Sequence, residues 1–156
     1  MAWEYLGGEK LTTTADILTV DGMAEKESLA LQIIGINSGQ IEPALVFNND
    51  TATNYSQKLS ANGGSFTTTT GQTNLELSSS THPQYANVSI TNFETEDKLV
   101  ISGTVSRSTA GAAYAPDRWE TVGEWDNSSD YITRIDIVNN GSGDFDADTE
   151  VIIFGA

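Results

Sequence analysis

The stretch "YITRIDIVNNGSGDFDADTEVIIFG", from Tyr131 to Gly155, decides the class of fold. Two runs rich in β-branched residues, 131–139 and 150–155, flank a segment of Asn, Gly, Ser and Asp. This pattern predicts two β-strands joined by a turn, because β-branched side chains favour strands and small polar residues favour turns. Phe145 is the large apolar residue of the turn, so we expect its side chain to point inward.

The same pattern recurs along the whole chain. Short runs with period-two alternation are separated by turn segments rich in Gly, Asn, Asp and Ser, which indicates an all-β fold with antiparallel pairing. We predict a β-sandwich of jelly-roll type with roughly eight to ten strands. The expected strands cover residues 11–20, 29–37, 44–48, 54–60, 73–79, 85–93, 98–106, 118–125, 131–139 and 150–155.

The remaining segments define the expected domain organisation. A helix competes with a strand only in residues 22–34, and Ile33 and Ile34 before Gly35 favour the strand. Residues 60–74 and 106–118 are predicted to be long loops, which in a compact domain tend to be functional or mobile. We expect an N-terminal arm over 1–8 and a single sandwich domain over 9–156.

Composition excludes several classes of function. The chain has 156 residues, no cysteine, and 22 acidic against 7 basic residues, for a net charge of −15. Without cysteine it forms neither disulfides nor thiolate metal sites. Its acidity opposes binding to nucleic acid and to anionic membranes, because both require clustered Lys and Arg. No run of about 18 apolar residues predicts a transmembrane helix.

Aspartate and glutamate near the C-terminus raise the question of calcium. Asp144, Asp146, Asp148 and Glu150 occupy every second position, which would place four oxygen ligands on one face of an extended segment. The alternative is that they are solvated acids of a turn, since the spacing does not match an EF-hand. A second, weaker candidate is Asn48, Asn49 and Asp50; no other cofactor is expected.

Aromatic residues are the other candidate binding groups. Trp119 and Trp125 lie six apart, so a regular strand places both on one face, either in the core or as a platform for sugar stacking. Tyr114 and Tyr131 flank this strand in the sequence. Trp3 and Tyr5 lie in the terminal arm, and an apolar arm often docks onto a neighbouring subunit or onto its own sheet.

No pattern of catalytic residues accompanies these candidates. The histidine of the chain, His82, precedes Pro83 in a segment with turn composition. The chain contains no nucleophile elbow, zinc-protease motif, phosphate-binding loop or dinucleotide fingerprint. We therefore predict that the protein is not an enzyme. A glycosidase-like arrangement of two carboxyl groups remains the third and weakest hypothesis.

Three stretches resemble one group of viral proteins. They are "LVFNNDTATNYSQKLSANGGS" (45–65), "KLVISGTVSRSTAGAAYAPDRWETVGEW" (98–125) and "ITRIDIVNNGSGDFDADTEVIIFG" (132–155). Together they resemble small β-sandwich structural proteins of tailed viruses of bacteria and archaea, over roughly residues 29–156. This chain is more acidic than that group, and "GDFDAD" carries two acids where the group has small or polar residues.

The resemblance implies a virion component, located in the mature particle after assembly in the host cytoplasm. Its expected role is capsid decoration, turret or tail-associated assembly, with other virion proteins as partners and a homotrimer or another cyclic homo-oligomer as its state. The alternative is a module that binds carbohydrate, such as a host-surface glycan. The residues predicted for assembly or binding are Trp3, Tyr5, Tyr114, Trp119 and Trp125.

The excess of acid leads to a prediction about salt. Either the protein is simply acidic, or it is adapted to high salt, as in a virus of a halophilic archaeon. In molar salt the Debye length is about 3 Å, so repulsion between acids is screened. We expect the midpoint of thermal unfolding to rise steeply between low and molar NaCl, as measured by circular dichroism. An unchanged midpoint would contradict adaptation to high salt.

Overall fold

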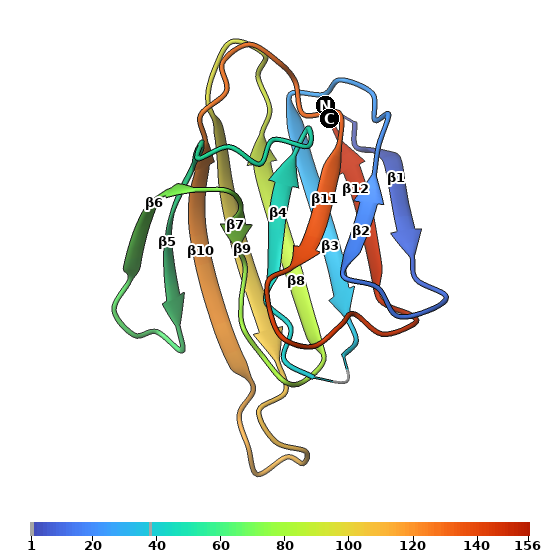
Figure 1. The fold of residues 1–156 in the computed structure, drawn as a ribbon, viewed down its shortest axis with the longest axis vertical. Helices are drawn as coiled ribbons and strands as arrows, with labels where there is room; N and C mark the ends of the chain where they lie inside the picture. The colour runs from blue at the N-terminus through green and yellow to red at the C-terminus, as the bar shows by residue number, and fades with distance from the viewer. Residues whose placement is uncertain (1, 38) are drawn as a thin grey trace.

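The computed structural model describes residues 2–37 and 39–156, and their regular structure is entirely β (Figure 1). The strands form two antiparallel sheets, which confirms the predicted all-β sandwich. Their bounds are β1 Glu4–Lys10, β2 Ile17–Val20, β3 Ser28–Gly35, β4 Pro43–Phe47, β5 Tyr55–Ala61, β6 Thr67–Gln72, β7 Leu75–Glu76, β8 Gln84–Thr91, β9 Lys98–Ser106, β10 Asp117–Trp125, β11 Ile135–Asn139 and β12 Glu150–Gly155. The described residues include no helix long and apolar enough to cross a membrane.

The strand order is that of a jelly roll with an extension. The large sheet has the order β1-β12-β3-β8-β9-β10-β5-β6, and the small sheet has the order β2-β11-β4-β7. Strands β1, β12, β3 and β8 of the large sheet correspond in order to β2, β11, β4 and β7 of the small sheet. The two strands of each corresponding pair are consecutive in the sequence. The chain passes from one sheet to the other eight times between β1 and β12, and four of these connections join the corresponding pairs, as in the double Greek key of a jelly roll. Strands β9, β10, β5 and β6 lengthen the large sheet beyond the eight strands of the roll.

Apolar side chains between the sheets form the core. In Figure 1, β2, β11 and β4 lie in front of the large sheet, and the inward positions of both layers are occupied mainly by Leu, Ile and Val. Each large aliphatic side chain that is fully buried contributes about 1.5–3 kcal/mol. Phe145 is fully buried, as predicted, and its backbone bridges to Ala15 and Asn37.

The turn before Phe145 contains two glycines that are required for close packing of the backbone and not for an unusual backbone conformation. Neither Gly141 nor Gly143 has a positive φ. A Cβ atom on Gly141 would lie 2.4 Å from the carbonyl oxygen of Gln40, and one on Gly143 would lie 2.8 Å from Gly39. These glycines therefore allow the backbone of the final turn to pack closely against residues 39–40.

Three predicted boundaries differ from the structure. Residues 4–8 belong to β1, which pairs with β12, so the boundary predicted between an arm and a domain falls inside a strand. The predicted strand 11–20 is regular only over β2, since Leu11 and Ala15 bond to the final turn instead. The predicted loop 60–74 contains β6, whose threonines pair with β5 to form an exposed edge strand.

Candidate functional site: the outer face of the large sheet

Strand β9 buries its more polar side and exposes its apolar side. Its inward positions carry Lys98, Val100, Ser102, Thr104 and Ser106, all of which are buried. Its outward positions carry Leu99, Ile101, Gly103 and Val105, and Ile101 is 65% exposed. A strand that faces water on its outer side normally shows the opposite arrangement. An exposed apolar row of this kind is typical of a binding surface.

The inward side of β9 is costly to bury. The hydroxyl groups of Ser102 and Thr104 are buried and have no hydrogen-bond partner among the described residues. Each buried polar group left unpaired costs about 1–3 kcal/mol. The Lys98 ammonium, in contrast, has hydrogen-bond partners. It donates to the carbonyl oxygens of Glu96 at 2.7 Å and Asn127 at 2.6 Å. Burial lowers the pKa of Lys98, although nearby acids oppose this effect.

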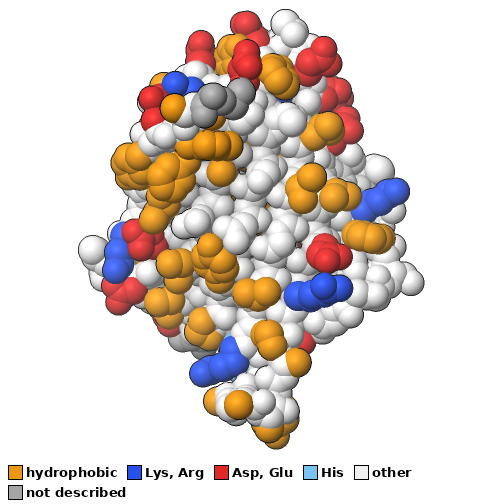
Figure 2. All heavy atoms as spheres, turned by 180° about the vertical axis from the view of Figure 1, so that it is seen from behind, with side chains coloured by type: hydrophobic (Ala, Val, Ile, Leu, Met, Phe, Trp, Pro, Cys, Tyr) orange, Lys and Arg blue, Asp and Glu red, His pale blue; other side chains and the backbone are white. Residues whose placement is uncertain are grey.

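Neighbouring strands continue the apolar row of β9. Val105 lies opposite Tyr85 of β8, which in turn lies opposite Ile34 of β3. Ile101 lies opposite Val122 of β10. We call this surface the apolar face and define it by the exposed residues Ile34, Tyr85, Leu99, Ile101, Val105 and Val122. Figure 2 shows hydrophobic side chains gathered over this side of the molecule, with most acidic side chains toward its margins.

The apolar face is electrically neutral although the protein is not. The charged residues at outward positions of β3, β8, β9, β10 and β5 are Lys58, Arg118, Glu120 and Glu124. Arg118 and Glu120 form an ion pair at 3.6 Å. Two bases and two acids cancel, so the net charge of −15 belongs to the rest of the chain. Another protein can therefore approach this face without the repulsion that the other surfaces exert.

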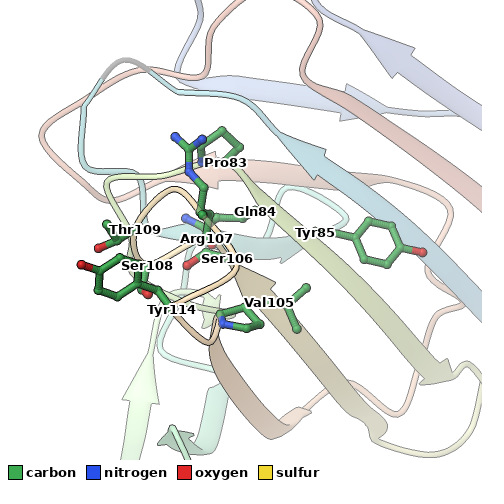
Figure 3. Close-up of a pocket in the computed structure, with 11 residues that line it drawn as sticks. Pro83, Gln84, Tyr85, Val105, Ser106, Arg107, Ser108, Thr109 and Tyr114 are labelled. Carbon is green, nitrogen blue, oxygen red and sulfur yellow. The ribbon is translucent and has the colours of Figure 1, made fainter.

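A groove lies at one end of the apolar face. It has a volume of about 500 Å³, and its walls include Tyr85 and Val105 together with Arg107 and Tyr114 from the loop between β9 and β10. Tyr114, predicted as a binding residue, is 57% exposed. Figure 3 shows Tyr85 and Tyr114 well apart, with Val105 between them. The groove extends the apolar face onto the predicted long loop.

A smaller and more polar hollow surrounds Trp119. It has a volume of about 310 Å³ and is lined by Trp119, Gln40, Ser79, His82 and Asp117, among others. Trp119 points to the inner side of β10 but is only half-buried, because it lies near the β10 end that the small sheet does not cover. One aromatic side chain among amide, hydroxyl and carboxyl groups matches the chemistry of sugar recognition.

Trp125 belongs to the core and is not a binding residue. It is 1% exposed and packs on Tyr55 and Phe47, with ring centroids 6.3 Å and 5.6 Å away. Its indole N–H donates to the Asp50 carboxylate at 2.8 Å. The even spacing of Trp119 and Trp125 did predict a shared face, but the small sheet covers only the Trp125 end.

The weaker calcium candidate at residues 48–50 is a hydrogen-bonded turn. Asn48 and Asn49 both have positive φ, which Asn tolerates well. The Asn48 side-chain oxygen accepts from the backbone of Thr133 and Arg134. The Asp50 carboxylate accepts three hydrogen bonds, from Trp125, Asn54 and Ala52. These side chains are engaged in holding the turn against β10 and the 131–134 segment.

The structure does not gather the stronger calcium candidates, Asp144, Asp146, Asp148 and Glu150, into one site. Asp148 forms an ion pair with Lys10 at 3.0 Å, whereas Asp144 lies beside Asp16. A hydrogen bond to Asp16 and the charge of Asp16 raise the pKa of the Asp144 carboxyl. Within residues 2–37 and 39–156, no three His, Asp or Glu side chains are placed to hold one metal ion together. Cation binding by this segment stays a prediction.

The other predicted residues are not among those that define the apolar face, although Tyr5 lies in line with it, since Tyr5 pairs with Phe154 and Phe154 pairs with Ala30 of β3. Trp3 is exposed next to β1, and Tyr5 packs edge-on against Phe154 at 6.1 Å. His82 is half-buried, and its ring nitrogen lies 3.3 Å from the Thr81 hydroxyl. The apolar face was not predicted, although the alternation of Leu99, Ile101 and Val105 with serine and threonine shows that the strand has two chemically different sides. The pattern alone does not tell which side faces inward.

Comparisons with known proteins do not place the chain in a family. No family model and no curated protein match it. Among solved structures, Scytalido-glutamic peptidase is 9% identical, with 96% of this chain and 66% of that chain covered and a TM-score of 0.29. The CBM2 module of the evolved Dit of Lactobacillus casei BL23 phage J-1 is 11% identical, covering 96% and 75%, with a TM-score of 0.28. A tetrameric galectin from the sponge Cinachyrella sp. is 10% identical, covering 90% and 98%, with a TM-score of 0.26.

The Asp50 turn yields a prediction about stability and pH. Burial alone would raise the pKa of the Asp50 carboxyl, but hydrogen bonds from Trp125, Asn54 and Ala52 hold it below its ordinary value of 3.8. The carboxylate therefore stabilises the fold above that value, and this contribution is lost as pH falls through the lowered pKa. We expect Asp50→Asn to destabilise the protein by about 1–3 kcal/mol at pH 7 in urea unfolding, since its amide cannot accept all these bonds.

The difference between Asp50→Asn and the parent should shrink as the pH falls below the ordinary carboxyl pKa. Asp126→Asn, at an exposed position just after β10, serves as the control and should behave like the parent. A destabilisation of Asp50→Asn that stays constant with pH would contradict a role for the charged carboxylate.

Proposed function

We propose that this protein is a non-enzymatic structural component of a virus particle, acting as a capsid decoration, turret or tail-associated protein. It works by protein–protein assembly, with other virion proteins as its partners. The resemblance of residues 29–156 to small virion β-sandwich proteins supports the viral setting. The jelly-roll strand order supports it in a general way, because viral capsid proteins commonly use that architecture.

The neutral apolar face is the observation that carries the assembly role. Leu99 and Ile101 project from β9 at exposures of 54% and 65%, on a strand whose buried side is polar. The fold would gain from the reverse orientation, since serine and threonine side chains could then face water. An assembly partner that covers the apolar side offsets this cost, because the side is then removed from water in the particle.

The location of the protein in particles tests this function. We expect antibody labelling and mass spectrometry of purified particles to find the protein at a fixed copy number on the capsid or tail. Ile101→Asp should reduce its occupancy, because a charged side chain then lies in the middle of the buried contact. Ile17→Asp changes an equally apolar, 44% exposed residue on the outer side of the small sheet and should leave occupancy unchanged. Absence from purified particles would refute the proposal.

A carbohydrate-binding module is the second candidate, and the hollow around Trp119 favours it. The half-buried indole provides an apolar surface for the C–H side of a sugar ring, while Gln40, Ser79 and Asp117 offer donors and acceptors beside it. A volume of about 310 Å³ fits one or two sugar units. The acidic surroundings favour a neutral sugar over an anionic one.

Tryptophan fluorescence tests the hollow. We expect cellobiose, lactose or chitobiose at millimolar concentration to change the emission of the parent protein, because the sugar ring stacks on Trp119. Trp119→Ala should abolish the change, whereas Trp3→Ala removes an exposed tryptophan outside the hollow and should preserve it. A response that survives in Trp119→Ala would assign the sugar to another place, and the absence of any response would argue against this candidate.

A further inference from the structure

The outward residues of the large sheet, which include those of the apolar face, form rows that cross the strands. Cross-strand pairing defines four such rows over β3, β8, β9, β10 and β5. The first row is Ile34, Tyr85, Val105 and Arg118; the second is Gln32, Asn87, Gly103, Glu120 and Ser60; the third is Ala30, Ser89, Ile101, Val122 and Lys58; the fourth includes Leu99, Glu124 and Ser56. Two apolar ridges therefore flank a second row that is polar and, at Gly103, has no side chain.

Gly103 has no explanation within the fold. Its φ is not positive, and a Cβ atom at this position would meet no atom of the described residues within 4 Å other than those of its chain neighbours. Glycine in the middle of a strand weakens the strand and often marks a place where another backbone or a ligand approaches closely. Two residues away, Ile101 is the most exposed large apolar side chain of the face. The surface thus carries a projecting group and an open position side by side on β9.

We propose that a second copy of this chain packs face to face on this surface, about a two-fold axis that lies between the second and third rows and crosses the strands. The inference rests on the assembly role proposed above and names the partner at that same face. Such an axis sets β9 against β9 of the second copy and places each second-row residue opposite a third-row residue. Two sheets in this arrangement pack about 10 Å apart.

This axis makes the apolar groups complementary. Ile101 meets the open position at the partner's Gly103, and by symmetry the same contact occurs twice. Val105 of the first row meets the partner's Leu99 of the fourth row. The three most exposed apolar side chains of β9 are therefore covered by the same strand of the second copy, as in an isologous interface.

The charges agree with the same axis. Arg118 of the first row lies opposite the partner's Glu124 of the fourth row, and opposite charges attract at this approach. Glu120 lies opposite the partner's Val122, which is the cross-strand neighbour of the partner's Lys58. All four charged residues of the face thus approach a charge of opposite sign. Because the rest of each chain is strongly acidic, this face is also where two copies meet with the least repulsion.

The mass in solution tests the pairing. By light scattering in molar NaCl we expect the parent protein to have twice the 16.7 kDa mass of one chain. Ile101→Asp should weaken the dimer roughly 30-fold or more, as the loss of a central contact does, whereas the control Ile17→Asp should not. Gly103→Val should also weaken it while leaving the thermal midpoint equal or higher, because the Cβ has open space and valine favours strands.

A charge exchange at lower ionic strength tests the orientation. At about 0.15 M salt, where charges are less screened, Arg118→Glu should weaken the dimer and the added change Glu124→Arg should restore it. A monomeric parent, a dimer unaffected by Ile101→Asp, or a double variant as weak as Arg118→Glu would each overturn the proposed pairing. These outcomes are separate from the particle experiment, since a protein monomeric in solution and present in particles would refute the dimer and leave the structural role standing.

Discussion

A sheet of four strands cannot cover a sheet of eight, and this mismatch governs the molecule. The small sheet lies against the jelly-roll half of the large sheet. It reaches β5 and β10 through β7, which has two residues, and through Phe47 at the end of β4. Under full cover, as at Trp125 and Tyr55, the interior is apolar and aromatic. Under partial cover, as at Trp119, the interior becomes polar and open to solvent.

The mismatch also accounts for the orientation of β9. Its inner side lies where the small sheet gives little cover and where other buried residues are also polar, such as Thr121 opposite Ser102, although the hydroxyls of Ser102 and Thr104 find no hydrogen-bond partner among the described residues. The apolar residues of β9 are consequently left on the outside. The added strands therefore create both candidate binding regions, the apolar face on one side of the sheet and the Trp119 hollow on the other.

Local sequence patterns predicted what depends on local chemistry. The alternation of β-branched residues identified most strands, and Phe145 was identified as an inward anchor because the turn around it is polar. The patterns failed where long-range packing decides. β1 contains Gly7 and Gly8, which lower strand propensity, but it is held by pairing to β12 at the other end of the chain. The outward orientation of the apolar side of β9 was not predicted, since it depends on which strands lie across the core.

The pairing of β1 with β12 has a consequence for the path of the chain. Glu4 lies opposite Gly155, and Figure 1 shows the two ends side by side. A short linker could join them, and the chain could be reopened in the 107–116 loop without cutting a strand. The same strand order in the sheets can thus be reached with a different order of strands along the chain. Circularly permuted forms opened in this loop can present new termini beside the apolar face.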